Sequence, residues 1–314
     1  MKGEIRYLLR KDIEDKRWNE CVRSSINGLC YSDSDYLDAM SADWSALVLN
    51  DYQAVMPLTW RRKFGIHYLY QPAFCQQTGI TMEGSMGSAI TEDFLSRVPK
   101  KFKYWDIQLN AFNSTIKYNS LPRKNFLLSL APGITELQGK YHRNAVRNIR
   151  KAQDLNIQIK ENIEPSMLMQ LHLSRFKEQN RIKAYEYKSF ENLLARWSAL
   201  SRVNIIGARD NKGDIIASSG YILYKNRITF VINGNADRSL TNGASHLLKD
   251  HIIRKYAGSD YILDFEGSDN PDFARFYQQF GAEMTEYYPR IIVNRLPWPL
   301  NGLKPQNAFS TARR

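Results

Sequence analysis

The chain is short of the residues that build disulfide and metal sites. Its three cysteines, Cys21, Cys30 and Cys75, form neither a CxxC pair nor an even disulfide set, so we expect reduced thiols and no structural zinc. Five histidines show neither HxxxH nor HxH spacing, and we therefore predict no metal site. The sequence also lacks GxSxG and GxxxxGK[ST], which argues against hydrolases with a nucleophile elbow and against P-loop proteins.

Long apolar runs are also missing. No window approaches 18 consecutive apolar residues, so no transmembrane helix is predicted. The first residues carry charges at Lys2, Glu4 and Arg6, which leaves no apolar centre for a signal peptide. We expect a cytoplasmic protein without an integral membrane segment, for which peripheral membrane contact stays open.

The composition that remains is that of a folded, basic protein. Of the 314 residues 43% are hydrophobic and 24% are charged, which excludes disorder over the whole length and leaves room for two domains. The formal net charge is +12. This excess favours an anionic partner such as nucleic acid, a phosphate compound or an anionic membrane, without choosing among them.

Hydrophobic periodicity divides the C-terminal half into alternating strands and helices. The predicted elements are a strand at 156–160, helices at 164–179 and 190–200, strands at 203–209, 215–224 and 228–233, a helix at 243–256, a strand at 261–265, a helix that begins at Pro271 and a strand at 290–294. The predicted order is therefore β-α-α-β-β-β-α-β-α-β.

Part of this order recurs in the N-terminal half. Strands are predicted at 45–50, 53–60 and 66–70, with a basic turn at 61–63, and a helix at 92–98 and a strand at 104–109 follow. The recurrence suggests a duplication with a period of roughly 160 residues. The β-α-α-β-β-β-α-β-α-β order resembles the GNAT acyltransferase fold. This resemblance implies an α/β (α+β) protein of two GNAT-like domains, each a mixed, mostly antiparallel sheet flanked by helices. The expected ranges are 1–133 for a degenerate N-terminal domain, 134–296 for a C-terminal domain and 297–314 for a proline-containing tail.

A basic amphipathic helix is predicted at 135–152, just after the expected boundary. Thr135 and Gln138 have the spacing of a capping box, and apolar residues follow at helical spacing. The opposite face carries Lys140, Arg143, Arg147, Arg150 and Lys151. These cations suit an acceptor phosphate or a tRNA backbone, and a solvated helix face is the alternative.

Two segments resemble the Fem family, whose members are tandem GNAT proteins that add amino acids to peptidoglycan precursors. Residues 141–152, YHRNAVRNIRKA, resemble the basic helix that opens the second domain of that family. Residues 264–268, DFEGS, followed by Pro271 and RFYQQFGA at 275–282, are similar to its strand-turn-helix near the C-terminus. The resemblance implies a FemABX-like acyltransferase of the compact type, because the long helical arm of larger members is absent.

The same resemblance leaves the acyl donor open between an acyl-CoA and an aminoacyl-tRNA. GNAT enzymes that use acetyl-CoA carry a Gln/Arg-x-x-Gly-x-Gly/Ala loop for the pyrophosphate. The matching residues here, 240–245, are LTNGAS, which keep only the middle glycine, Gly243. No metal is expected from the histidine spacing, and the acceptor that the resemblance implies is a small molecule or a cell-wall precursor that carries an amine.

Two acidic residues of the second motif are candidate catalytic groups. Asp264 and Glu266 stand two apart on a predicted strand and are expected on one face. Either carboxylate could accept a proton from an attacking amine. The alternative is that Asp264 is a structural hydrogen-bond acceptor for neighbouring loops.

Donor-binding residues are predicted around the end of the strand 228–233 and the helices that follow. The N-G-N sequence at 233–235 falls where GNAT folds separate two strands to admit the donor, although a plain turn explains it equally well. The candidates are Asn233, Asn235, Arg238, Gly243, Ser268, Asn270 and Tyr277.

The N-terminal half offers candidates for acceptor binding. Arg61 and Arg62 belong to the predicted basic turn, and several aromatic and amide residues follow it. Asp106 alternates with Gln108 and Asn110 along one predicted strand face, which either borders a substrate cleft or faces solvent. A basic turn that serves solubility alone is the other interpretation of Arg61 and Arg62.

The function expected from these residues is N-acyl transfer, in which an acceptor amine attacks an activated acyl carbonyl directly. Direct attack fits the absence of a nucleophile motif, because catalysis then rests on positioning and on hydrogen bonds to the developing oxyanion. A CoA-dependent N-acetyltransferase is one alternative. A non-catalytic module that binds RNA or an anionic glycan is the other.

Overall fold

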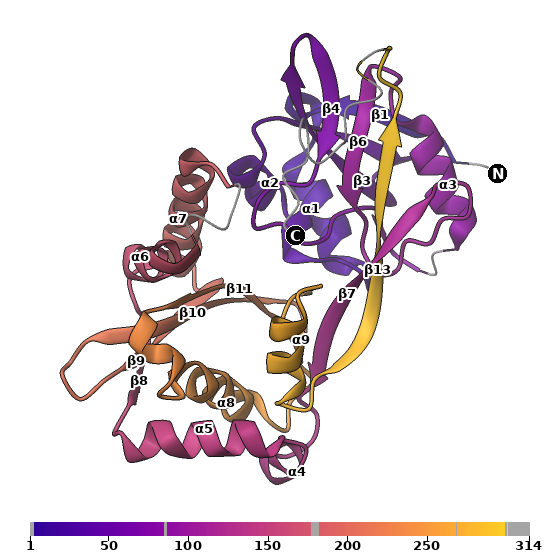
Figure 1. The fold of residues 1–314 in the computed structure, drawn as a ribbon. Helices are drawn as coiled ribbons and strands as arrows, with labels where there is room; N and C mark the ends of the chain where they lie inside the picture. The colour runs from indigo at the N-terminus through magenta and orange to yellow at the C-terminus, as the bar shows by residue number, and fades with distance from the viewer. Residues whose placement is uncertain (1–2, 85–86, 177–181, 268, 299, 301–314) are drawn as a thin grey trace. The chain divides into compact units, whose positions relative to one another are not determined.

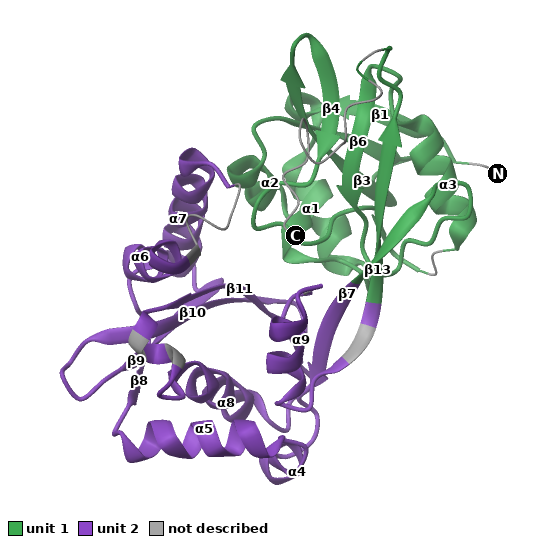
Figure 2. Cartoon of the chain, viewed as in Figure 1, with its two compact units in different colours: residues 1–123, 287–313 green, residues 124–286, 314 purple. Residues whose placement is uncertain are grey.

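The computed structural model describes residues 3–84, 87–176, 182–267, 269–298 and 300. The chain forms two compact units, which Figure 2 colours separately. Unit 1 comprises residues up to Arg123 together with the segment that begins at Tyr287, and unit 2 comprises Lys124–Glu286. Each unit contains a sheet and its own helices (Figure 1).

The boundaries differ from the predicted ones at 133 and 296. Two long strands, β7 (Ser120–Ser129) and β13 (Glu283–Asn294), each begin in one unit and end in the other. The boundaries therefore fall inside extended chain, where no turn or change in composition marks them. Sequence patterns place boundaries at turns, and here the turns lie several residues away.

Unit 1 is built on a sheet with the strand order β1-β2-β3-β4-β6-β13, and β5 pairs with β3. All of its described pairs are antiparallel except β4 with β6. Its core gathers Leu58, Leu69, Phe94 and Trp105. Besides β13, the elements are β1 (Ile5–Leu9), α1 (Asp15–Ser24), α2 (Ser34–Met40), β2 (Trp44–Leu49), β3 (Ala54–Lys63), β4 (Ile66–Tyr70), β5 (Thr81–Met82), α3 (Ser88–Arg97) and β6 (Phe102–Gln108), with short 3-10 helices at Arg10–Asp12 and Cys30–Ser32.

Unit 2 has the strand order β7-β12-β11-β10-β9-β8, and again its described pairs are antiparallel except one, β11 with β12. α6 and α7 cover one face, and α5 and α8 lie at the other (Figure 1). The elements are α4 (Ile134–Gly139), α5 (Arg143–Asp154), β8 (Gln158–Lys160), α6 (Pro165–Phe176), α7 (Ala184–Ala199), β9 (Val203–Arg209), β10 (Ile215–Tyr224), β11 (Arg227–Asn235), a 3-10 helix (Asp237–Leu240), α8 (Ala244–Tyr256), β12 (Ile262–Asp264) and α9 (Pro271–Gln278).

The predicted order of elements is confirmed from the strand at 156–160 to the helix that begins at Pro271, and the strands 203–209 and 215–224 match residue for residue. The predicted closing strand, 290–294, lies in β13, but these residues belong to unit 1, where they pair with β6. The single helix predicted at 135–152 is wrong. The chain breaks between α4 and α5, and Gly133 rather than Thr135 precedes the first helical residue, without a side-chain cap. The break is held by tertiary bonds, since the His142 N–H donates to the Gln279 carbonyl at 2.9 Å and Tyr141 Oη donates to Asp250 at 3.1 Å.

The predicted basic turn at 61–63 is also shifted. Arg61, Arg62 and Lys63 lie in β3, and the two-residue turn is Phe64-Gly65, both with positive φ. Three strands joined by two hairpins are nevertheless confirmed in this half. Among the described residues, no helix is long and apolar enough to cross a membrane.

Candidate functional site

The parallel strands of unit 2 separate soon after they meet. β11 pairs with β12 only from Arg227 to Thr229, opposite Ile262 to Asp264, where β12 ends. β11 continues to Asn235 and stays paired with β10 on its other side. Within the described residues, the β12-facing edge of β11 is therefore without a strand partner from Phe230 onward. An open strand edge exposes backbone donors and acceptors to a ligand.

Asn233 lies on this open part of β11, and its side chain is held in one orientation. Its Oδ1 accepts from Lys249 Nζ at 2.6 Å and from Ser219 Oγ at 2.8 Å. An ammonium group only donates, so the amide atom that faces it must be the oxygen. The Nδ2 group consequently points away from Lys249, and it makes no hydrogen bond to any residue that the structure describes. Asn233 is partly exposed, so this donor is available to a bound molecule.

Lys249 is a buried cation on α8, only 2% exposed. Its Nζ lies 3.1 Å from Ser219 Oγ and 3.4 Å from the centre of the Phe230 ring. No carboxylate within the described part of the chain pairs with it. Burial lowers the pKa of Lys249 well below its usual value, because an ammonium group loses its hydration in the interior.

Sequence reasoning missed Lys249, although a signal was present. Lys249 stands three residues before Ile252 and four before Ile253, which places it on the apolar face of the predicted helix at 243–256. A lysine on an apolar face is rarely buried without a specific role.

The backbone of β11 next to Asn233 is held in place by α6, which crosses the strand closely at Gly234. A Cβ on Gly234 would lie 2.7 Å from Leu171 Cβ and 2.8 Å from the His172 nitrogen, so α6 can approach this closely only over a glycine. His172 Nδ1 also bonds the Asn233 carbonyl at 2.8 Å. The strand end that carries Asn233 is therefore rigid, which is what a positioned donor requires.

The N-terminus of α8 is the place where a GNAT fold would hold a pyrophosphate, and here it is crowded. Gly243 has φ +81°, and a Cβ there would lie 2.0 Å from the Asn148 carbonyl oxygen of α5. The Ala244 N–H donates to Asn242 Oδ1 at 3.0 Å. A side chain thus already occupies a first-turn amide that an anion would use, and α5 packs on the same turn.

The two candidate carboxylates have different surroundings. Asp264 is 1% exposed and pairs with Arg227 Nε at 2.8 Å, while its other oxygen accepts the Glu266 N–H at 2.9 Å. Arg227 also bonds Glu286 at 2.8 Å. Burial raises the pKa of Asp264, and the adjacent Arg227 opposes that rise. This geometry favours the structural alternative for Asp264.

Glu266 is partly exposed and lies beyond the end of β12. Its φ of +60° turns the chain out of the strand, so the expectation that Asp264 and Glu266 share a strand face is wrong. A non-glycine residue in this region of φ is uncommon and clusters at functional sites. A proton-accepting role for Glu266 stays a prediction.

The other predicted donor-binding residues are dispersed. Asn235 Oδ1 accepts from Ser245 Oγ at 2.5 Å, which joins β11 to the first turn of α8. Asn270 caps α9 by accepting the Asp272 N–H at 2.9 Å, and Tyr277 packs its ring against Phe265. Ser268 and the side chain of Arg238 lie outside the described residues. The structure thus brings Asn233 and Asn235 together and places Asn270 and Tyr277 in capping and packing positions.

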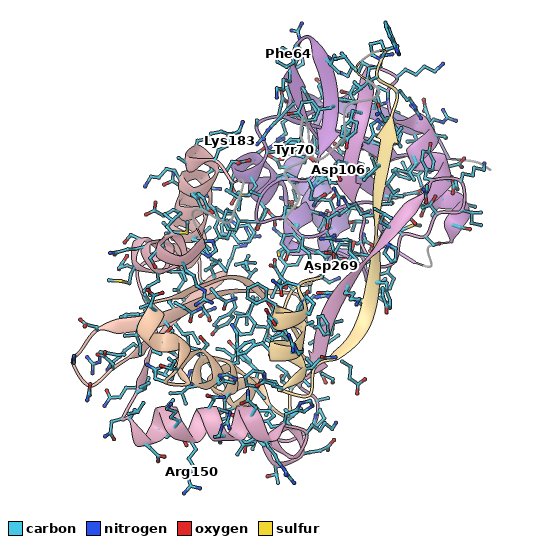
Figure 3. The ribbon with its side chains drawn as sticks, viewed as in Figure 1. Phe64, Tyr70, Asp106, Arg150, Lys183 and Asp269 are labelled. Carbon is cyan, nitrogen blue, oxygen red and sulfur yellow. The ribbon has the colours of Figure 1, made fainter. Side chains whose placement is uncertain are left out.

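The predicted basic face is split between two short helices. Arg143 and Arg147 are exposed on α5, and Figure 3 shows that Arg150, on the same helix, points away from unit 2. Lys140 directly follows α4, forms an exposed ion pair with Glu136 at 3.2 Å and lines a hollow of about 300 Å³ beside β7 and β12. Only the α5 residues therefore share one exposed surface.

The acceptor candidates of unit 1 are largely engaged within the fold. Asp106 is 2% exposed, and both of its oxygens accept from Arg290, at 2.7 and 2.8 Å. Asp106 therefore neither borders a substrate cleft nor faces solvent, and both predicted positions are wrong. Arg61 stacks on Tyr70, with its guanidinium carbon 4.1 Å from the ring centre, whereas Arg62 is exposed.

Comparison with known proteins supports the fold. No protein-family model and no curated protein matches the chain. Among solved structures, FemX has a TM-score of 0.64 at 12% identity, over 96% of this chain and 99% of its own. The C-terminal domain of a putative lysylphosphatidylglycerol synthetase from Agrobacterium fabrum has a TM-score of 0.57 at 10% identity, over 91% and 93%.

A tandem GNAT protein from the clavulanic acid biosynthesis pathway has a TM-score of 0.52 at 9% identity, over 94% of this chain and 99% of its own. Together with the strand orders of the two units, these likenesses confirm the prediction that the chain has a tandem-GNAT fold of the FemABX-like type.

Proposed function

We propose that this protein is an N-acyltransferase in which an acceptor amine attacks an activated acyl carbonyl held against β11. The observation that carries the proposal is the Asn233 amide, whose oxygen is fixed by Lys249 and Ser219 while its Nδ2 is left to donate at the open strand edge. The fold likeness to FemX and to a tandem GNAT protein supports this class of reaction.

In the proposed reaction, the amine nitrogen forms a bond to the carbonyl carbon, and negative charge develops on the carbonyl oxygen. Asn233 Nδ2 donates to that oxygen, and the hydrogen bond that Lys249 donates to Oδ1 polarises the amide and strengthens the Nδ2 donor. The C–O or C–S bond to the leaving group then breaks, and the proton lost by the amine passes to a base while the leaving group is protonated. Glu266 is the partly exposed carboxylate that we assign to proton acceptance.

We further propose aminoacyl-tRNA as the donor, with an acyl-CoA as the alternative. The first-turn amide of α8 is taken by Asn242, and the Asn148 carbonyl crowds Gly243, which disfavours a pyrophosphate there. The exposed cations of α5, Arg143 and Arg147, suit a polynucleotide backbone instead. The acceptor is then an amine on a small molecule or a cell-wall precursor.

Replacement of Asn233 tests the proposed donor directly. Asn233→Ala should lower the transfer rate about 10²- to 10³-fold, the usual loss for one oxyanion-hole donor. Its melting temperature should also fall, because the buried Lys249 loses a hydrogen-bond acceptor, so the rates are compared at a temperature where the variant is folded. Asn211→Ala, in the exposed β9–β10 turn, is the matched control and should transfer at the wild-type rate. Equal rates for both variants and the wild type would refute the role of Asn233.

The donor is tested by ligand-induced stabilisation. A ligand at 100 times its Kd stabilises the folded state by about 2.7 kcal/mol, which shifts a melting curve clearly. We expect a shift with charged tRNA and none with acetyl-CoA. A shift with acetyl-CoA alone would overturn the tRNA assignment, and RNA binding without any transfer would favour the non-catalytic binding module.

A further inference from the structure

Three segments of unit 1 contain no aspartate or glutamate, and they meet at one end of its sheet. The segments are 60–70, 94–105 and 287–300. The parallel β4–β6 pair aligns His67 with Phe102, and the antiparallel β6–β13 pair aligns Tyr104 with Asn294. The β3–β4 turn, the start of β6 and the end of β13 therefore lie side by side, about 10 Å across two strand spacings.

Four cations of these segments are exposed at that end. Arg62 comes from the hairpin, Lys101 and Lys103 flank the start of β6, and Arg295 follows β13. Arg62 and Lys101 both lie close enough to His67 to lower its pKa, after burial as the larger cause. Within the part of the chain that the structure describes, none of these four cations pairs with a carboxylate.

Two aromatic side chains stand in water among these cations. Phe64, at the tip of the β3–β4 hairpin, is 87% exposed, and Trp298, four residues after β13, is 84% exposed. Figure 3 shows Phe64 projecting from the hairpin tip. Lys63 Nζ lies 5.4 Å from the Phe64 ring centre.

Phe64 is a poor residue for the folding of this turn. It has φ +51° and is followed by Gly65 at +79°, a two-residue turn in which Asn-Gly is preferred and a bulky residue at positive φ is an outlier. A phenylalanine there strains the backbone and buries almost none of its ring. The stability of unit 1 therefore does not explain why a phenylalanine stands at this position. Burial of the Phe64 ring in an apolar environment outside the protein does explain it.

We propose that this surface, formed by Arg62, Phe64, Lys101, Lys103, Arg295 and Trp298 and called here the basic-aromatic end, docks unit 1 on an anionic lipid bilayer. Phe64 and Trp298 enter the interfacial region, where aromatic side chains are enriched, and the four cations meet the anionic headgroups. The inference concerns unit 1 alone and does not depend on the transfer reaction proposed for unit 2.

A bilayer fits these features better than a nucleic acid does. RNA would use the cations, but an aromatic side chain that binds bases usually lies on a sheet or groove beside the backbone contacts. Phe64 instead lies at the extreme tip of a two-residue turn, the position of an insertion loop.

The test is flotation of the full chain with vesicles of phosphatidylcholine alone or with about one third phosphatidylglycerol. Wild type should float with the anionic vesicles only, and added salt should weaken the binding. Phe64→Asn should weaken it about tenfold or more, while its melting temperature stays unchanged or rises because Asn-Gly suits the turn. Arg62→Gln with Lys101→Gln should weaken it roughly 30-fold, from about 1 kcal/mol per cation.

Matched controls separate this surface from general stickiness. Ile116→Asn removes an apolar side chain that is 84% exposed in the segment after β6, at the opposite end of the sheet. Lys151→Gln with Lys212→Gln removes two exposed cations from unit 2. Both variants should float like wild type. Wild-type flotation by Phe64→Asn, equal losses in the controls, no flotation of wild type, or displacement by RNA at equimolar concentration would each overturn the proposal.

Discussion

The two units share one arrangement, a single parallel strand pair in an otherwise antiparallel sheet, but only one of these pairs opens. In unit 1, β4 and β6 pair from His67 to Tyr70, and the closure continues through the bridge between Thr78 and Leu109. Gln71 Oε1 also accepts the Gln108 N–H at 3.0 Å. In unit 2 the β11–β12 pair stops after three residues. The same topology thus gives a closed sheet in one unit and an accessible strand edge in the other.

A buried ion pair in unit 1 and a buried lysine in unit 2 also differ, because only the ion pair contains groups of opposite charge. Asp106 and Arg290 in unit 1 satisfy each other through two hydrogen bonds, which makes a structural pair. Lys249 in unit 2 has only neutral partners and the Phe230 ring. A buried cation without a carboxylate is unfavourable for folding. Stability explains the Asp106–Arg290 pair of unit 1 and the Asp264–Arg227 pair of unit 2, whereas it does not explain Lys249, to which we assign a role in the proposed reaction.

The largest effect should come from breaking the buried pair of unit 1. Arg290→Met leaves the Asp106 carboxylate buried without its partner, which destabilises a protein by about 3–5 kcal/mol. We expect a lower midpoint in chemical unfolding. The double variant Asp106→Asn with Arg290→Met should recover part of the loss, and a single variant as stable as wild type would remove the structural assignment.

The second effect sharpens the assignment of Lys249. Lys249→Met should keep the free energy of unfolding within about 1 kcal/mol of wild type, because a desolvated charge is replaced by an apolar side chain of similar length. Transfer should fall about 10- to 100-fold, because Asn233 loses one of the two groups that orient and polarise it. Steady-state kinetics should place the loss in kcat rather than in KM. Unfolding of the variant, or full activity, would contradict this.

The smallest effect is a pH dependence of stability. The pKa of Lys249 is lowered in the folded chain by burial, so between that value and the ordinary lysine pKa of about 10.4 the unfolded chain binds more protons. The free energy of unfolding should therefore rise with pH across this window below pH 10. Lys249→Met should lack that rise. Urea unfolding of both proteins at several pH values measures the difference, and identical slopes would show that Lys249 titrates normally.

Much of unit 2 could be predicted because its turns are marked locally. The strands at 203–209 and 215–224 are separated by Asp210-Asn211-Lys212-Gly213-Asp214, a polar turn with a glycine at φ +92°. Alternating apolar residues on both sides fix the strand type. The unit boundaries could not be predicted in this way, because β7 and β13 pass through them as unbroken strands.

Among the candidate site residues, the sequence by itself determined the residue types and their positions along the elements, including Asn233 at the end of a strand and a lysine on the apolar face of α8. Only the tertiary structure decided which of them meet. Arg227 bonds both Asp264, 37 residues away in the chain, and Glu286, 59 residues away, and Lys249 reaches Asn233 across 16 residues. Hydrogen bonds and desolvation depend on distances in space, which local periodicity does not contain.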